Sequence, residues 1–167
     1  MTPDIFWIKD ITPLRLAVMP RPRAGEWLVD EIAGFAHLGV SVIVSLLEPH
    51  EVVALGLQDE QALCTSHGIE LLSYPIADRN VPESMLRTHI MISSLVDRLH
   101  KGESVAIHCR AGIGRTGLIA GCVLTQLGYK PAEALQIIST ARRVQVPDTE
   151  QQKEWLSRYA QAYPYQS

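Results

Sequence analysis

The stretch Val105-Ala-Ile-His-Cys-Arg-Ala-Gly-Ile-Gly-Arg-Thr-Gly117 decides the fold. A buried strand from Ser104 to His108 leads into a glycine-rich turn, and an almost uncharged helix follows from about Arg115 to Leu127. The backbone N–H groups of such a turn can point at one centre beside a helix N-terminus, which makes an anion site. Gly112 and Gly114 permit the positive φ angles that this arrangement needs. The stretch therefore predicts an anion-binding loop in an α/β protein.

Strand-like and helix-like segments alternate on both sides of this loop. Before it, hydrophobic periodicity predicts extended pieces at 6–8 and 14–18, a helix at 24–38, a strand at 40–47, short helical turns within 50–66, a strand at 69–74 and a long helix from Pro82 to Gly102. After it, one helix opens at Pro131 and another at Asp148, where Asp148 and Gln151 have capping-box spacing. This alternation predicts an α/β fold: one domain over residues 1–167, with a central, mostly parallel sheet of about four to five strands and helices on both faces.

The composition is that of an ordinary globular protein. The chain has 167 residues, 47% of them hydrophobic and 20% charged, and a formal net charge of −3. A slightly acidic total argues against a nucleic-acid partner. The N-terminus lacks the pattern of a signal peptide, and the least charged stretch, Gly117 to Gly128, is about 12 residues and too short to cross a bilayer. We expect a cytoplasmic monomer with no membrane contact, and three cysteines are too few for a disulfide framework.

Three interpretations of the loop compete. Gly112, Gly114 and Gly117 match a dinucleotide-binding pattern, but only helices follow, so a second mononucleotide-binding half is missing. A nucleotide P-loop would have a glycine at Cys109 and a lysine at Arg115. The third interpretation explains both substitutions: the loop dipoles stabilise a cysteine thiolate, and an arginine offers a two-pronged donor to phosphate oxygens. The group attacked should then be a phosphoryl.

His108-Cys109, five residues, then Arg115-Thr116 resembles the signature loop of the cysteine-dependent protein tyrosine phosphatases, and the layout is similar to their compact dual-specificity branch. The resemblance implies that Cys109 is the nucleophile, that Thr116 donates to its sulfur, and that a buried His108 orients the loop. It implies that the phosphoryl oxygens are held by the Arg115 side chain and by the amides of Arg110, Ala111, Gly112, Ile113, Gly114 and Arg115. It also implies no cofactor and no metal.

The same resemblance calls for a general acid some 30 residues before the nucleophile. Asp78 lies 109 − 78 = 31 residues upstream, in the loop from Tyr74 to Pro82. Ile76-Ala77 replace the usual Trp-Pro before it. The alternative is that Asp78 only makes a turn with Asn80.

Several positions stay open. Many relatives place a glutamine or glutamate where this chain has Pro147, so Gln151, Gln152 or Asp148 takes over the hydrolytic water, or Asp78 acts alone; Gln151 is equally a capping-box partner. A basic rim for acidic substrates could comprise Arg110, Arg79, Arg142, Arg143 and the loop Arg21 to Arg23. Cys64 or Cys122 could trap an oxidised Cys109 as a disulfide.

The resulting hypothesis is a phosphatase that acts on phosphotyrosine in proteins, and on phosphoserine or phosphothreonine if its pocket is shallow. The alternatives are a phosphoinositide or RNA 5′-phosphate phosphatase of the same superfamily, or a catalytically idle phosphate-binding module. Such modules usually lose the cysteine or the arginine, whereas Cys109 and Arg115 are both present here.

Overall fold

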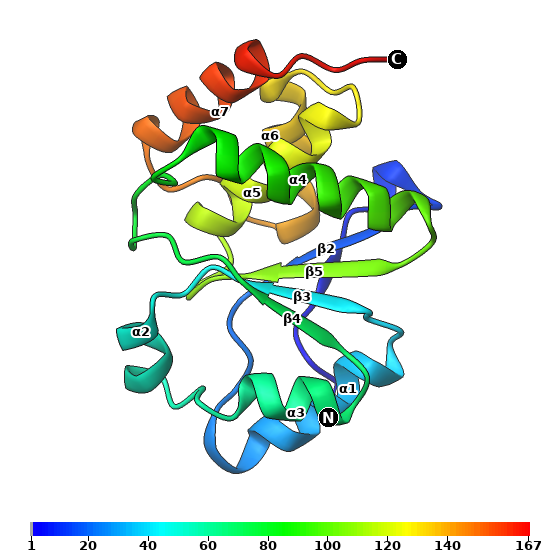
Figure 1. The fold of residues 1–167 in the computed structure, drawn as a ribbon, viewed down its shortest axis with the longest axis vertical. Helices are drawn as coiled ribbons and strands as arrows, with labels where there is room; N and C mark the ends of the chain where they lie inside the picture. The colour runs from blue at the N-terminus through cyan, green and yellow to red at the C-terminus, as the bar shows by residue number, and fades with distance from the viewer. Residues whose placement is uncertain (1) are drawn as a thin grey trace.

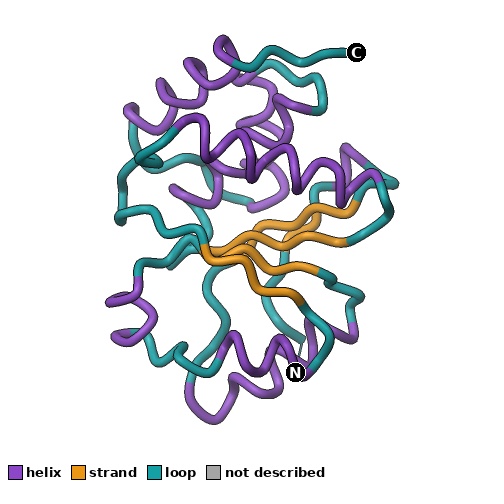
Figure 2. The backbone as a smooth tube through the Cα atoms, in the orientation of Figure 1, coloured by secondary structure: helices purple, strands orange, loops and turns teal. Residues whose placement is uncertain are grey.

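The computed structural model describes residues 2–167 and places a five-stranded sheet between two layers of helices (Figures 1 and 2). The strands are β1 (Phe6–Trp7), β2 (Arg15–Met19), β3 (Val42–Ser45), β4 (Glu70–Ser73) and β5 (Ser104–His108). Their order across the sheet is β1-β2-β5-β3-β4, with β1 antiparallel to β2 and the other pairs parallel. The predicted α/β class, with a mostly parallel sheet of four to five strands, is confirmed.

Seven α-helices of the described chain cover the two faces of this sheet (Figure 1). They are α1 (Leu28–His37), α2 (Pro49–Ala54), α3 (Glu60–Ser66), α4 (Met85–His100), α5 (Gly114–Gln126), α6 (Pro131–Arg142) and α7 (Glu150–Ala162). Helices α1 and α3 pack on one face, and α4 to α7 on the other, with α2 beside the carboxyl ends of the strands. Nearly every residue of α5 is buried because it lies between the sheet and the other helices of its layer.

Strand β5 occupies the centre of the sheet, and its side chains alternate between the two cores. Val105 and Ile107 join the core under α4 to α7, and Ala106 joins the core under α1 and α3. His108 shares the parity of Ala106, so its side chain enters the α1/α3 layer. The loop that follows emerges at the carboxyl edge of the sheet, where ligands of open α/β sheets bind.

Two helix starts differ from the sequence-based expectation. Helix α2 begins at Pro49, one residue before the predicted range 50–66, with the proline as its first helical residue. Helix α4 begins at Met85 and not at Pro82, because the hydroxyl of Ser84 caps it by accepting from Arg87 N.

No helix of the described residues is long and apolar enough to cross a membrane.

Candidate active site

The loop from Cys109 to Arg115 joins the end of β5 to the start of α5, as the sequence predicts. Cys109 is buried, with only 3% of its surface exposed. Gly112 has a φ of +75°, and a Cβ there would collide with the backbone of Met19 and Pro20. Arg21 N donates to Arg110 O at 3.1 Å. The loop from Cys109 to Arg115 is called the phosphate loop below. The segment after β2 is therefore packed directly against it.

Arg115 is the best anchored side chain of the loop, although it carries a charge and is only 2% exposed. Its Nη1 donates to Glu51 Oε1 at 2.7 Å and to Ile76 O at 2.8 Å. Its Nη2 donates to Glu51 Oε2 at 3.0 Å and to Asp78 Oδ1 at 3.2 Å. Within residues 2–167 these hydrogen bonds use the Nη atoms of Arg115, and none uses its Nε.

Glu51 pairs with Arg115, and its sequence context did not single it out. It lies in the first turn of α2, where the capping-box spacing from Glu48 gives only a helix-start signal. Burial by itself would raise the pKa of Glu51, but hydrogen bonds from Arg115 and from the Glu48 backbone, with the charges of Arg115 and Arg110, lower it overall. Glu51 is therefore a carboxylate at neutral pH and fixes the orientation of the Arg115 fork.

Asp78 comes from the loop between β4 and α4, and its side chain is 53% exposed. This loop, residues 74–82, is called the acid loop below. Asn80 N bonds back to Ala77 O, which makes the turn that the alternative interpretation expected, yet Asp78 also reaches Arg115. The structure brings Asp78 and Arg115 together from segments 37 residues apart.

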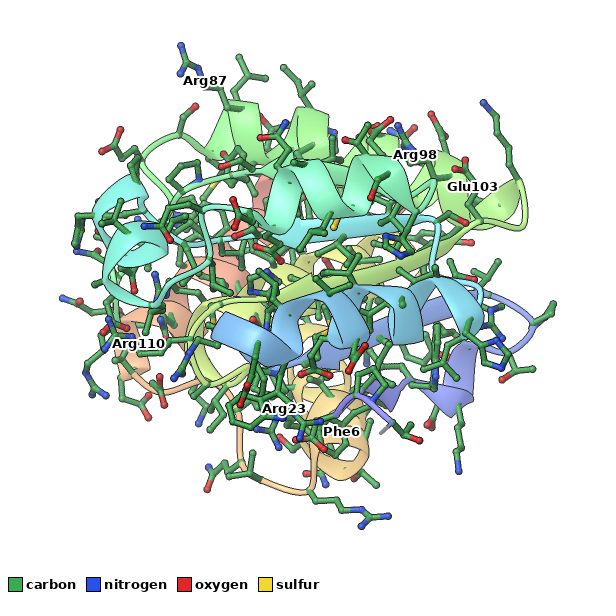
Figure 3. The ribbon with its side chains drawn as sticks, turned by 90° about the horizontal axis from the view of Figure 1, so that it is seen from below. Phe6, Arg23, Arg87, Arg98, Glu103 and Arg110 are labelled. Atoms are coloured by element: carbon green, nitrogen blue, oxygen red, sulfur yellow. The ribbon has the colours of Figure 1, made fainter. Side chains whose placement is uncertain are left out.

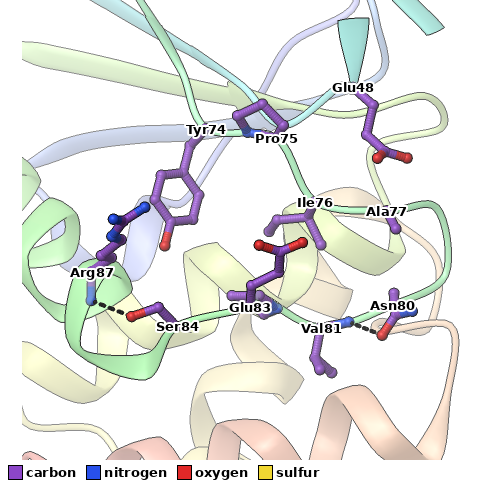
Figure 4. A pocket seen from close by; sticks show the side chains of 11 residues that line it. Glu48, Tyr74, Pro75, Ile76, Ala77, Asn80, Val81, Glu83, Ser84 and Arg87 are labelled. Atoms are coloured by element: carbon purple, nitrogen blue, oxygen red, sulfur yellow. Dashed lines mark hydrogen bonds between the residues drawn. The ribbon is translucent and has the colours of Figure 1, made fainter. Parts of the chain in front are cut away.

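A cavity of about 590 Å³ lies beside the acid loop (Figure 4). Two carboxylates, those of Glu48 and Glu83, line it together with Tyr74 and Arg87. In the close-up the Glu83 carboxylate extends towards the space between Tyr74 and Ile76. The acid loop therefore borders a cavity whose walls carry two carboxylates and one guanidinium.

His108 is completely buried and forms an ion pair with Glu60 of α3. Its Nε2 lies 2.7 Å from Glu60 Oε2, and its Nδ1 lies 3.0 Å from Cys109 O. Both partners are acceptors, so a ring that donates to both carries two protons. Burial lowers the pKa of His108, but the charge and hydrogen bond of Glu60 and the bond to Cys109 outweigh it and raise the pKa overall. The backbone carbonyl of Cys109 is thus held by an imidazolium.

Replacing Glu60 by Gln is expected to abolish the pH dependence that this pair gives to stability. A raised histidine pKa stabilises the fold fully below the ordinary value of 6.5, and this contribution is lost as pH rises through the folded-state pKa. Urea unfolding of the parent should show a loss approaching about 1.4 kcal/mol per pH unit from this group above that value. The Glu60→Gln protein should lack this slope.

Other titrating groups are common to both proteins, so only the difference between the two curves matters. Parallel curves across this range would mean that His108 is not charged in the folded state. Phosphatase assays of Glu60→Gln measure whether losing the Glu60 carboxylate also lowers activity, as expected if His108 holds the Cys109 carbonyl in place.

Arg142, expected in a basic rim, instead supports the loop from behind. Its Nη2 donates to Ala111 O at 2.8 Å, its Nε donates to Gly112 O at 3.3 Å, and its guanidinium lies 4.6 Å from the Phe6 ring centre. Fixing these carbonyls leaves the loop amides free to face the opposite direction. Arg142 is therefore a positioning residue, while Arg143 is exposed at the end of α6.

The segment before α7 corrects the predicted capping box. Thr149, not Asp148, caps the helix, and its partner is the buried Gln152, not Gln151. Gln152 Oε1 accepts from Asp148 N and Thr149 N, and its Nε2 donates to Asn80 O, so it ties α7 to the acid loop. Gln151 is exposed. The Asp148 carboxylate packs against Gly114, where a Cβ would overlap it.

The remaining predicted residues have simple surroundings. Thr116 Oγ1 is buried without a hydrogen-bond partner in the described part of the chain, so its donation to the cysteine sulfur stays a prediction. Cys64 and Cys122 are buried, free thiols, and burial raises the pKa of Cys64 to about 12. The described residues contain no group of three or more side chains that could hold a metal.

Curated proteins with related sequences include two named as tyrosine phosphatases. The chain is 33% identical over 90 residues to 067L of Invertebrate iridescent virus 3, and 29% identical over 85 residues to type IVA 2 of Mus musculus. These alignments cover 50% of this chain in each case, and 38% and 51% of the respective relatives. The chain therefore spans about half or less of their lengths.

Solved structures of similar fold match almost the whole chain. A kinase associated phosphatase superimposes with a TM-score of 0.87 at 18% identity, covering 100% of this chain and 99% of that one, which establishes similarity of fold. The active form of Tk-PTP gives a TM-score of 0.77 at 26% identity, with coverages of 96% and 99%.

A family model supplies the assignment. Residues 6–162 match the model described as the Swiss Army Knife protein, DSP-PTPase phosphatase domain. This range contains every element from β1 to α7, including the complete loop from Cys109 to Arg115. The chain therefore belongs to the DSP-PTPase phosphatase family, in agreement with the resemblance that its signature loop carries.

Proposed function

We propose that the protein hydrolyses phosphate monoesters of tyrosine in proteins, and those of serine or threonine where the pocket admits them, through a cysteinyl-phosphate. One observation carries the proposal: Arg115, held by Glu51 at the mouth of the Cys109 loop, also contacts the predicted acid Asp78. This contact supports a site in which an anion-binding side chain, the proposed nucleophile and the proposed proton donor act on one phosphoryl group. Family membership over nearly the whole chain supports the same chemistry.

The first step transfers the phosphoryl group to sulfur. The Cys109 thiolate attacks phosphorus, the S–P bond forms and the P–O bond to the substrate breaks, while Asp78 gives its proton to the leaving oxygen. The loop amides and Arg115 hold the other phosphoryl oxygens. In the second step Asp78 takes a proton from water, whose oxygen attacks phosphorus, and the Cys109 thiolate leaves as inorganic phosphate is released.

The contact between Asp78 and Arg115 suggests that phosphate binds before Asp78 reaches the leaving oxygen. Nε of Arg115 has no partner within the described chain, and one Nη2 donor is held by Asp78. A phosphate that takes both donors displaces the Asp78 side chain from Arg115. Once the freed carboxylate has taken up a proton from solvent, it can give that proton to the leaving oxygen. Among the three side chains considered for the hydrolytic water, Asp148 contacts the loop through Gly114, whereas Gln152 is engaged by the backbone of Asp148, Thr149 and Asn80. Gln151 lies beyond the cap, in the first turn of α7. We therefore assign the water-positioning role to Asp148.

Replacing Asp78 by Asn is expected to lower kcat on a phosphotyrosine peptide by roughly 10²-fold, because the leaving oxygen then departs without a proton. The loss should be smaller on p-nitrophenyl phosphate, whose leaving group is a weaker base. The alkaline limb of the rate-versus-pH profile, which reports the donated proton, should disappear. Steady-state rates on both substrates across pH measure these effects.

Asp97→Asn, at an exposed position of α4, is the matched control and should behave like the parent. Full activity of Asp78→Asn with an unchanged alkaline limb would show that the acid is another group. A panel of phosphopeptides and soluble inositol phosphates, tested on the parent, separates the proposed substrates from the phosphoinositide alternative. No turnover on any of them would favour the idle binding module.

A further inference from the structure

A second pocket lies on the other side of the phosphate loop from the acid loop. It has a volume of about 520 Å³ and is lined by residues of the segment after β2 and by Leu55. The lining comprises Arg21, Pro22, Arg23, Ala24, Trp27 and Leu55. Because β2 and β4 lie on opposite sides of β5 in the sheet, the segment that follows β2 and the acid loop that follows β4 leave the sheet on opposite sides of β5. This space is called the Arg21 pocket below.

The Arg21 pocket is attached rigidly to the phosphate loop. Arg21 N donates to Arg110 O at 3.1 Å, and the backbone of Met19 and Pro20 packs tightly against Gly112. The far end of the segment is fixed to α1, where the buried Glu31 accepts from Arg23 N at 2.9 Å and from Arg23 Nε at 3.1 Å. The position of the pocket relative to a bound phosphate is thus set before substrate arrives.

The pocket carries positive charge next to an apolar surface. Within residues 2–167 no ion pair or hydrogen bond engages the Arg21 guanidinium, and Arg21 is exposed. Arg110 is also exposed, with a side chain 48% accessible and its Nη2 3.6 Å from the buried Glu51. Figure 3 shows Arg110 projecting from the edge of the molecule, at the opposite end from Arg98 and Glu103. Trp27, 47% exposed, adds an indole face.

The cavity beside the acid loop differs in charge. Two carboxylates, those of Glu48 and Glu83, line it with one cation, Arg87. The charged residues that line the Arg21 pocket are both arginines. An anionic group of a substrate therefore meets only positively charged side chains in the Arg21 pocket and charges of both signs in the other cavity.

We propose that the Arg21 pocket is a specificity subsite that binds an anionic side chain of the phosphopeptide, a carboxylate or a second phosphate ester, close in sequence to the phosphoresidue. This inference rests on the proposed function and adds the charge of the substrate to it. Arg21 pairs with the anion, and the Trp27 ring covers the aliphatic part of the same side chain. Rigid attachment to the phosphate loop lowers the ordering cost of this contact.

The test compares matched peptides on the parent and on Arg21→Glu. Phosphotyrosine peptides carry a single Glu at each flanking position in turn, with Gln, Lys or phosphoserine in its place as the alternatives. The readout is the ratio of kcat/KM for the Glu peptide to that for its Gln partner within one protein, so a general loss of activity cancels. The parent should favour Glu at one position by about three- to fivefold, which is typical of an exposed ion pair.

Arg21→Glu should reverse this preference, favouring Lys at the same position. Arg158→Gln, at an exposed position of α7, should keep the ratio of the parent. A phosphoserine peptide that exceeds the Glu peptide identifies the second phosphate as the better occupant, and equality or the reverse identifies the carboxylate. Equal ratios near one at every position in the parent, or an unaltered ratio in Arg21→Glu, would overturn the subsite. Failure to hydrolyse even p-nitrophenyl phosphate would instead count against the proposed phosphatase activity.

Discussion

Cys109→Ser is expected to abolish turnover of phosphotyrosine peptides and of p-nitrophenyl phosphate, with a fall in kcat of roughly 10⁴-fold or more. A serine hydroxyl has nearly the shape of the thiol but does not ionise at neutral pH, even beside Arg115 and the loop amides. The buried site should still bind phosphate, because the amides and the Arg115 fork are unchanged. Steady-state assays measure the loss, and binding of a phosphopeptide to the variant measures what is retained.

The parent should also yield a phosphoenzyme when turnover is quenched in acid, located on Cys109 by peptide mass analysis. Cys64→Ala is the matched control, because Cys64 is a buried free thiol in the core on the α1/α3 side of the sheet. It should retain activity and give the same phosphoenzyme. Undiminished turnover in Cys109→Ser, or a phosphoenzyme located elsewhere, would rule out the cysteinyl-phosphate route.

Glu51→Gln is expected to weaken both the fold and catalysis. The Arg115 guanidinium would lose the carboxylate that binds both of its Nη atoms, and breaking such a buried pair costs about 3 kcal/mol. A glutamine side chain presents one oxygen in place of two, so the fork can rotate away from the phosphoryl oxygens. We expect kcat/KM on p-nitrophenyl phosphate to fall about 10²-fold. Urea unfolding and steady-state kinetics measure the two effects.

The stability difference between parent and Glu51→Gln should depend on pH. The pKa of Glu51 is lowered below its ordinary value of 4.5, so its contribution is complete above that value and is lost as pH falls through the folded-state pKa. The gap between the two proteins should therefore narrow in acid. Glu154→Gln, exposed on α7, is the control and should unfold like the parent. A constant gap down to acid pH would mean that the carboxylate charge is not what holds Arg115.

The loop from Cys109 to Arg115 and the layering of the fold could be predicted because local sequence determines them. Strand β5, the glycines and the start of α5 are consecutive, so spacing alone gave the arrangement from Cys109 to Arg115. The place of Asp78 beside the loop followed from its distance before Cys109 and its position after a strand, and the contact with Arg115 agrees with it. Each of these inferences needs only the order of elements and the geometry of a helix N-terminus.

The supporting side chains could not be predicted, because tertiary contacts alone create their roles. Glu51 lies 64 residues before Arg115, and Glu60 lies 48 residues before His108. In sequence both are ordinary glutamates in short, polar helices. From the sequence, Arg142 is a charged residue at the end of a helix. It donates to Ala111 O only because the fold brings the end of α6 next to the loop. The helix cap is Thr149 and not the predicted Asp148. Because the cap lies one residue later, the buried capping partner is Gln152 and not Gln151.

The central place of β5 in the sheet also bears on how the molecule opens. Its backbone is hydrogen-bonded to β2 on one side and β3 on the other, whereas β1 and β4 each have one neighbour. Amide hydrogens of edge strands exchange through small local openings, while those of a central strand exchange only when most of the domain unfolds. The nucleophile is therefore carried by the segment slowest to exchange with solvent, and the rim of the sheet can fray while the phosphate loop keeps its shape.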